Sequence, residues 1–273
     1  MPRVVRLKQK KGGGFYQRLR IPHIDELCND DLSGCVVGLD VMRELAARPK
    51  RRYTYQLLLA PEMIGTIFYI VNNPDRLGKT IAILNLETVG AGKDWLLKRA
   101  LRKGERFEEA LRQVFLRYDI AHNEGDFFSG YGNDERIFAW PGINVPGIAI
   151  QRFPFREYHT SHDTPEILSP RLMAEAIAIT DAFVDVLESD YAPKLVYRTQ
   201  PWLTRNGLYF DATLDRERNR KFNNLVLYNI DGNNTLLDLA RISGIEFSML
   251  RDYLERFCTK GLLSKREPVL TEN

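Results

Sequence analysis

Hydrophobic residues follow two different spacings along the first part of the chain. Weak alternation of apolar and polar residues predicts a strand at residues 15–21, and further strands are predicted at residues 53–59, 80–86 and 147–153. Apolar residues three and four positions apart predict helices at residues 33–47, 64–71, 105–118 and 170–189. Because strands and helices of these lengths alternate, we predict an α/β fold with a mainly parallel central sheet flanked by helices.

The pattern changes after residue 192. A dense run of charges precedes three predicted helices, at residues 222–230, 236–242 and 246–259. Three helices with a tight turn at Gly244 between the last two resemble a small winged-helix domain. We therefore predict two domains, residues 1–192 and 193–273. The last helix carries acidic and basic residues in balance, which favours contacts with protein over contacts with DNA.

Composition narrows the class of protein. The chain has 273 residues, of which 44% are apolar and 27% charged, as in ordinary soluble domains. The longest apolar stretch, residues 53–71, is interrupted by Gln56, Pro61 and Glu62, so it should not span a membrane. Three cysteines fit a reducing compartment. We predict a cytoplasmic protein with no membrane association.

Basic residues are concentrated at the start of the chain. The net charge is only +3, yet residues 1–20 contain seven Lys and Arg and no acidic residue. Such an arm can contact phosphate, or it can simply be a solvated end of the chain. We favour the solvated end, and DNA is not an expected partner.

Imidazoles and carboxylates gather where the predicted strands end. They are His23, Asp25, Asp30, Glu62, Glu87 and His159. The ends of parallel strands meet at one edge of an open sheet, which is where ligands bind. A mixture of these side chains at one edge is the donor set that zinc requires.

The order of the motifs that contain these residues is informative. It runs His-x-Asp (23–25), Asp-Asp-x-Ser-Gly (30–34), Glu62, Asn-Leu-Glu-x-x-Gly (85–90) and His-Thr-x-x-Asp-Thr (159–164). This order resembles the two-zinc aminopeptidases, a family that includes bacterial leucyl aminopeptidases, glutamate carboxypeptidase and the transferrin receptor ectodomain. It is most similar to bacterial aminopeptidase-like proteins that end in a winged helix and are often encoded beside polysaccharide-biosynthesis genes.

The resemblance implies a zinc site with one or two ions and a zinc aminopeptidase-like fold. His23 and Glu87 would hold one ion, Glu62 and His159 the other, and Asp30 would bridge them. Asp25 would orient His23 by accepting its other N–H. Asp163 is expected to shape the loop after His159 through bonds to backbone.

Pro61 departs from the family pattern. The family has two consecutive glutamates after the second strand, a general base and then a metal ligand, whereas here Pro61 precedes Glu62. If Glu62 is the ligand, a base is missing; if it is the base, a ligand is missing. Asp134 or Glu135 is a conceivable substitute base.

A second departure concerns substrate binding, for which Asp134, Glu135 and Arg136 are candidates. Arg136 stands where relatives commonly carry His, and its guanidinium could grip a substrate carboxylate. It could equally pair with Asp134 or Glu135.

Simpler interpretations remain open for each residue. His23 and His159 could be ordinary loop histidines, Glu87 could be a solvated charge, and Asp30 or Asp31 could cap the following helix. The ordered set of motifs favours the metal interpretation.

We therefore predict a zinc-dependent aminopeptidase-like hydrolase. It would cleave an N-terminal residue or a small amide with a metal-activated water. The alternative is a catalytically impaired binding or scaffold protein, linked to polysaccharide biosynthesis. The family usually has strands ahead of His-x-Asp, so the chain is either a C-terminal portion or has a short sheet edge that a partner covers. A homo-oligomer could form through that edge or through the C-terminal domain.

Overall fold

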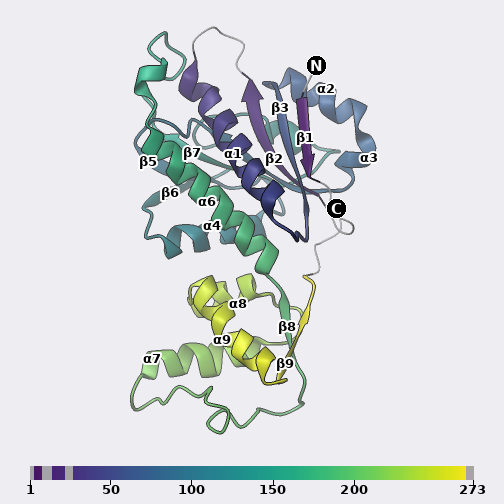
Figure 1. Cartoon of the computed structure of the whole chain (residues 1–273), viewed down its shortest axis with the longest axis vertical. Helices are drawn as coiled ribbons and strands as arrows, with labels where there is room; N and C mark the ends of the chain where they lie inside the picture. The colour runs from purple at the N-terminus through teal and green to yellow at the C-terminus, as the bar shows by residue number, and fades with distance from the viewer. Residues whose placement is uncertain (1–2, 8–13, 22–26, 269–273) are drawn as a thin grey trace. The chain divides into compact units, whose positions relative to one another are not determined.

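Seven strands form one sheet in the first of two units into which the chain divides, Met1–Glu188 (Figure 1). The computed structural model describes residues 3–7, 14–21 and 27–268. Across the sheet the strands are β1 (Arg3–Leu7), β3 (Thr54–Pro61), β2 (Gly14–Ile21), β4 (Thr80–Glu87), β7 (Gly147–Phe153), β5 (Asp94–Lys98) and β6 (His122–Gly125). Neighbouring strands are parallel except for β1 against β3 and β5 against β7. The predicted α/β fold with a mainly parallel sheet is confirmed.

Two long helices cover one face of this sheet. They are α1 (Gly34–Ala47) and α6 (Pro170–Ser189), which lie side by side in Figure 1. Arg48, at the end of α1, joins them by ion pairs of 2.6 Å to Asp181 and to Asp185. The hydroxyl of Tyr55 on β3 donates to Glu188 of α6, so odd-numbered residues of β3 face these helices.

Even-numbered residues of β3 face the other side of the sheet. Gln56 donates to the hydroxyl of Tyr69 on α2 (Ile64–Asn72). A core cluster joins this side of the sheet to α2 and to α5 (Glu135–Phe138), and it contains Leu58, Ala60, Tyr69, Ile70, Ile83, Phe138 and Val145. Two further helices of this unit are α3 (Pro74–Leu77) and α4 (Glu105–Arg117), and η2 (Pro165–Ile167) precedes α6.

The principal predicted elements of this unit correspond to β2, β3, β4, β7, α1, α2, α4 and α6, within a few residues at each end. Three strands were not predicted: β1, β5 and β6. Residues 3–7 pair with 55–59 of β3, so this part of the basic arm is not simply a solvated end, because its backbone is hydrogen-bonded in the sheet.

The second unit, Ser189–Glu272, contains a two-stranded antiparallel sheet of β8 (Ala192–Leu195) and β9 (Leu263–Arg266). Its helices are α7 (Arg216–Arg218), η3 (Asn219–Val226), η4 (Leu227–Asn229), α8 (Leu236–Ser243) and α9 (Phe247–Thr259). Thr235 and Asp238 form a reciprocal cap at the start of α8, and Gly244 ends it in the left-handed conformation. Its identity as a winged helix stays a prediction.

In the part of the chain that the structure describes, no helix combines the length and the apolar character needed to cross a bilayer. The cytoplasmic location stays a prediction.

Candidate active site

The turn between β2 and α1 carries two consecutive aspartates. In η1 (Cys28–Ser33), Asp30 and Asp31 have non-helical backbone angles, and both side chains are fully buried. Gly34 follows because a Cβ at this position would collide with the carbonyl oxygen of Leu86 on β4. The sequence Asp-Asp-x-Ser-Gly thus places two carboxylates directly against the end of the central strand.

Asp163 holds this turn from the loop after β7. Its two carboxylate oxygens accept the backbone N–H groups of Asn29 (2.7 Å) and Asp30 (2.9 Å). Its carbonyl oxygen accepts the N–H of Cys28 (3.1 Å). Asp163 was expected to shape its own loop after His159, whereas its carboxylate bonds to the backbone of the turn that presents Asp30.

Asn29 and Ser33 tie the same turn to the loop after β4. The side-chain oxygen of Asn29 accepts the N–H groups of Gly90 (2.8 Å) and Ala91 (2.9 Å). The Ser33 hydroxyl donates to the carbonyl of Asn29 and accepts the N–H of Val89. Polar side chains therefore join the loops that follow β2, β4 and β7 into one buried network.

His159 meets Asp30 at this network. Its Nε2 lies 3.3 Å from Oδ2 of Asp30, although 59% of the His159 side chain is exposed and Asp30 is buried. Asp31 turns to the next loop, where its carboxylate accepts the N–H of Thr88 (3.3 Å). The structure thus brings together two of the predicted metal ligands, one from the loop after β2 and one from the loop after β7.

Glu87 ends β4 and is buried, so it is not a solvated charge. Burial, followed by the negative charges of Glu135 and Asp30, raises its pKa to about 8, while the Asn133 amide and Lys98 oppose the shift. Its Oε2 accepts a hydrogen bond from Asn85 (3.3 Å), but among the described residues its Oε1 has no hydrogen-bond partner. Lys98 and the Asn133 amide therefore offset only part of the cost of ionising this buried carboxyl group.

The side chain of Glu135 forms a buried ion pair. It is fully buried, and its Oε1 is 2.6 Å from Nζ of Lys98, which is also fully buried. Lys98 donates in addition to the carbonyl of Tyr131 (2.7 Å). This buried ion pair with extra hydrogen bonds anchors the segment before α5 to the end of β5.

The neighbours of Glu135 occupy different surroundings. Asp134 is buried and accepts the N–H of Met63 (2.8 Å), which links it to the turn that carries Glu62. Arg136 is exposed, and its guanidinium folds back over Gly132. Glu62 follows β3 and is half-buried at the same edge of the sheet. The substrate-binding role of residues 134–136 stays a prediction.

Two predicted residues, His23 and Asp25, lie outside the described residues. Across residues 27–268 and the two described strands before them, no three His, Cys, Asp or Glu side chains are placed to hold a metal ion. Asp30 and His159 nevertheless form the carboxylate–imidazole pair that zinc prefers, and Glu87 offers a buried oxygen without a partner. Asp30 and His159 are thus two donors of the kinds that zinc accepts, and a zinc site would need further ligands beside them.

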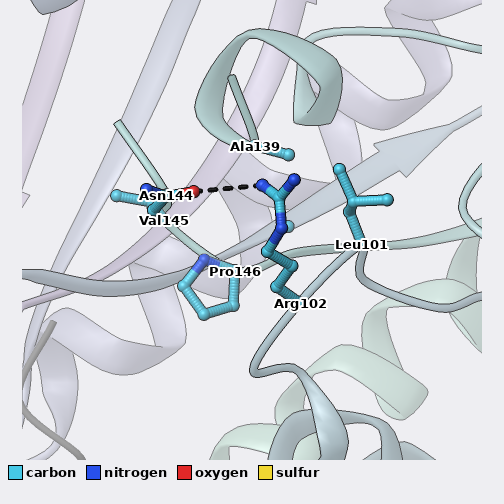
Figure 2. Close-up of a pocket in the computed structure, with 7 residues that line it drawn as sticks. Leu101, Arg102, Ala139, Asn144, Val145 and Pro146 are labelled. Carbon is cyan, nitrogen blue, oxygen red and sulfur yellow. Dashed lines mark hydrogen bonds between the residues drawn. The ribbon is translucent and has the colours of Figure 1, made fainter. Parts of the chain in front are cut away.

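Cavities elsewhere in this unit do not coincide with these residues. Figure 2 shows a small pocket where Arg102 donates to Asn144 (3.1 Å), beside Pro146 at the start of β7. Its volume of about 10 Å³ is near the minimum for one water molecule. Two larger hollows, of about 420 and 340 Å³, contain none of the predicted site residues.

Solved structures share this arrangement of sheet and helices. A structure described as that of a peptidase from Clostridium acetobutylicum is 25% identical and superposes with a TM-score of 0.85 over 97% of this chain and 60% of that one. A zinc aminopeptidase from Bacillus subtilis, 16% identical, gives a TM-score of 0.56 over 67% of this chain and 48% of the other. The chain therefore has an aminopeptidase-like α/β fold.

Sequence comparison assigns the chain more narrowly. Residues 21–190 match the family described as "Domain of unknown function (DUF4910)", and the chain belongs to that family. A Clostridium acetobutylicum protein named for polysaccharide biosynthesis and an aminopeptidase-like domain is 28% identical in an alignment of 232 residues, which covers 82% of this chain and 52% of that protein. The chain thus spans about half the length of this curated relative.

Several residues of the network were not singled out from the sequence. The hydrophobic pattern does not mark Asn29 or Lys98. The Asn29 side chain bonds to backbone, and Lys98 is a cation at the end of a short strand. One signal was available for Lys98: it directly follows the apolar run Trp95-Leu96-Leu97, so a strand there would carry it into the interior.

Proposed function

We propose that the chain is a zinc-dependent aminopeptidase-like hydrolase, which releases an N-terminal residue from a small peptide or cleaves a small amide. The contact between His159 and Asp30 carries the proposal, because it joins two motifs that are 129 positions apart in the sequence. Glu87 supports it, since a buried carboxyl group with a raised pKa and an unpartnered oxygen is typical of a site that binds a cation.

Asp30 and His159 would hold the zinc ion, with Glu87 and His23 as further candidate ligands. When bound, the ion lowers the pKa of a water molecule and polarises the scissile carbonyl. Asp163 keeps Asp30 in place through the backbone of the turn. Hydrogen bonds among the three loops fix the donors before substrate arrives, which reduces the reorganisation that catalysis requires.

Glu62 is the carboxylate that we assign to proton transfer. Asp134 and Glu135, the other candidate bases, are buried, and each is engaged by the protein, at Met63 and at Lys98. Glu62 remains half-buried at the sheet edge, where it can accept a proton from the attacking water and pass it to the leaving amine. With Glu62 used in this way, the donors favour one zinc ion over two.

The test combines metal analysis with turnover. Purified protein should contain zinc at neutral pH and hydrolyse an aminoacyl-anilide, and a chelator should abolish the hydrolysis until zinc is restored. His159→Ala should lose both the zinc and the activity. His162→Ala is a matched control, because His162 is exposed three residues further along the same loop and should keep both. Absence of zinc, or equal zinc content in the two variants, would refute the proposal.

Pro61 supports a second candidate, a binding or scaffold protein that has lost hydrolysis. It occupies the place of the first of the two glutamates expected after β3, so only one carboxylate remains in that turn. The named relative would connect such a protein to polysaccharide biosynthesis. Zinc binding without any chelator-sensitive turnover of peptide or amide substrates would favour this candidate over the hydrolase.

A further inference from the structure

His159 lacks the support that metal-binding histidines usually have. Such histidines commonly donate their second ring N–H to a carboxylate or carbonyl, which fixes the ring. Within residues 27–268, no hydrogen bond holds Nδ1 of His159, and the residue has a left-handed backbone (φ 56°) on an exposed loop. Among the described residues, the contacts left to orient the imidazole toward Asp30 are those between rings.

Ring stacking supplies this orientation. The imidazole of His159 lies flat against Tyr158, with ring centroids 3.9 Å apart and planes inclined by 16°. Tyr158 in turn lies flat against Tyr131, at 3.8 Å and 17°. The three rings form one continuous stack, called here the His159 stack, whose outer member is the histidine.

Tyr131 is the fixed end of the His159 stack. Its hydroxyl accepts the N–H of Phe155 (3.1 Å) and donates to the carbonyl of the same residue (3.2 Å). Its backbone N–H donates to the side chain of Gln151 on β7 (2.9 Å), and its carbonyl accepts the ammonium of Lys98 (2.7 Å). Both ends of the residue are therefore bound to the central sheet or to the loop that leaves it.

We propose that Tyr131 is a positioning residue, which holds the imidazole of His159 toward Asp30 through the His159 stack. Tyr131 lies 28 positions before His159, on the segment that precedes α5, so the stack connects two separate loops at the sheet edge. Its consequence for zinc rests on the proposed function, whereas the orientation of the ring does not.

The first experiment measures the NMR resonances of the His159 imidazole in zinc-free protein. Stacking places the carbon-bound protons of His159 over the face of Tyr158, so their NMR resonances should be shifted upfield, with assignment by His159→Ala. Tyr131→Leu should move these resonances toward random-coil values, and Tyr131→Phe, which keeps the ring, should largely preserve the shift. Tyr118→Leu, at an exposed tyrosine after α4, is the control for loss of a tyrosine ring.

The second experiment measures zinc affinity by competition with a chromogenic chelator. Loss of a supporting partner of a metal-bound histidine typically weakens affinity about 10- to 100-fold, so Tyr131→Leu should lower zinc affinity at least about 10-fold. Tyr131→Phe and Tyr118→Leu should change it much less. If Tyr131→Leu does not fold, Tyr158→Leu against Tyr158→Phe makes the same comparison at the middle ring.

The outcomes separate the two proposals. Unchanged His159 resonances in both leucine variants would overturn the positioning role, whatever the protein hydrolyses. An unchanged zinc affinity combined with a lower melting temperature would also overturn it, since that result describes a structural tyrosine. Absence of zinc binding in the unmodified chain would instead refute the proposed function, and the resonances would still decide the role of Tyr131.

Discussion

The turn after β2 and the turn after β3 end at the same edge of the sheet, yet they are held very differently. The first, which carries Asp30, is bound by Asp163, Asn29 and Ser33 to two neighbouring loops. The second, which carries Glu62, is linked to Asp134 through the N–H of Met63 (2.8 Å). Asp30 is buried, whereas Glu62 is half-buried.

The contrast separates two uses of a carboxylate at a strand end. A buried carboxylate needs several partners to remain in place without a compensating charge, and those partners fix its geometry. A half-buried carboxylate at the rim remains in contact with water and can exchange protons with it. Binding a cation suits the first turn, and proton transfer suits the second.

The largest effect should come from breaking the first turn. Asp163→Ala removes two charge-assisted hydrogen bonds and leaves the buried N–H groups of Asn29 and Asp30 unpaired, so we expect a loss of about 3 kcal/mol in unfolding free energy. Urea denaturation measures it. Asp126→Ala is the matched control, because exposed Asp126 also accepts a backbone N–H, that of Phe128, and should cost less. Equal losses of unfolding free energy in the two variants would show that the buried hydrogen bonds stabilise the protein no more than the exposed one.

A second effect, smaller for each pH unit than the loss expected from Asp163→Ala, should follow pH in zinc-free protein. Folding raises the pKa of Glu87 from 4.5 to about 8, so the folded state retains a proton that the unfolded state has released between these values. The contribution of Glu87 to the unfolding free energy should therefore be most favourable at about pH 4.5 and below, and fall by up to about 1.4 kcal/mol per unit as pH rises toward 8. Denaturation of Glu87→Gln should show a flatter dependence, whereas Glu105→Gln, at an exposed position, should retain it. A steep dependence that survives Glu87→Gln would assign the effect to another group.

The smallest effect on stability should come from the second turn. Glu62→Gln changes a half-buried side chain, so we expect a shift in unfolding free energy within about 0.5 kcal/mol. Its turnover should nevertheless fall by about 100-fold or more, since a general base is lost. Glu44→Gln on α1 controls for an exposed glutamate. A zinc content that falls with Glu62→Gln would instead make Glu62 a ligand and place both turns in the same role.

The predictable elements of the fold were those with a strong hydrophobic period. The helix at 170–189 was predicted to the residue because its apolar face repeats over five turns, and β4 was clear from an unbroken apolar run. β1 and β6 could not be found in this way. Basic residues interrupt the first, and the second, with the sequence His-Asn-Glu-Gly, has no apolar residue at all. Both pair through backbone with a neighbour far along the chain.

Residues of the candidate site could be predicted only where they belong to a recognisable sequence motif. Asp30 and His159 belong to recognisable motifs, and the structure places their side chains together. Lys98 and Tyr131 belong to none, and their importance appears only when β5 brings the cation beside Glu135 and the carbonyl of Tyr131. A local pattern contains no information about such long-range polar pairs.

The reversal of β5 has a practical consequence for anyone who redesigns this edge. Because β5 runs antiparallel to β7, the chain passes from the end of β4 to the start of β5 through residues 88–93 without leaving the rim. Within this short connection, the side-chain oxygen of Asn29 accepts the backbone N–H groups of Gly90 and Ala91. Loops grafted here would therefore disturb the turn that presents Asp30, and loops grafted at Thr160 and Ser161 would disturb it too, because these residues lie between His159 and Asp163.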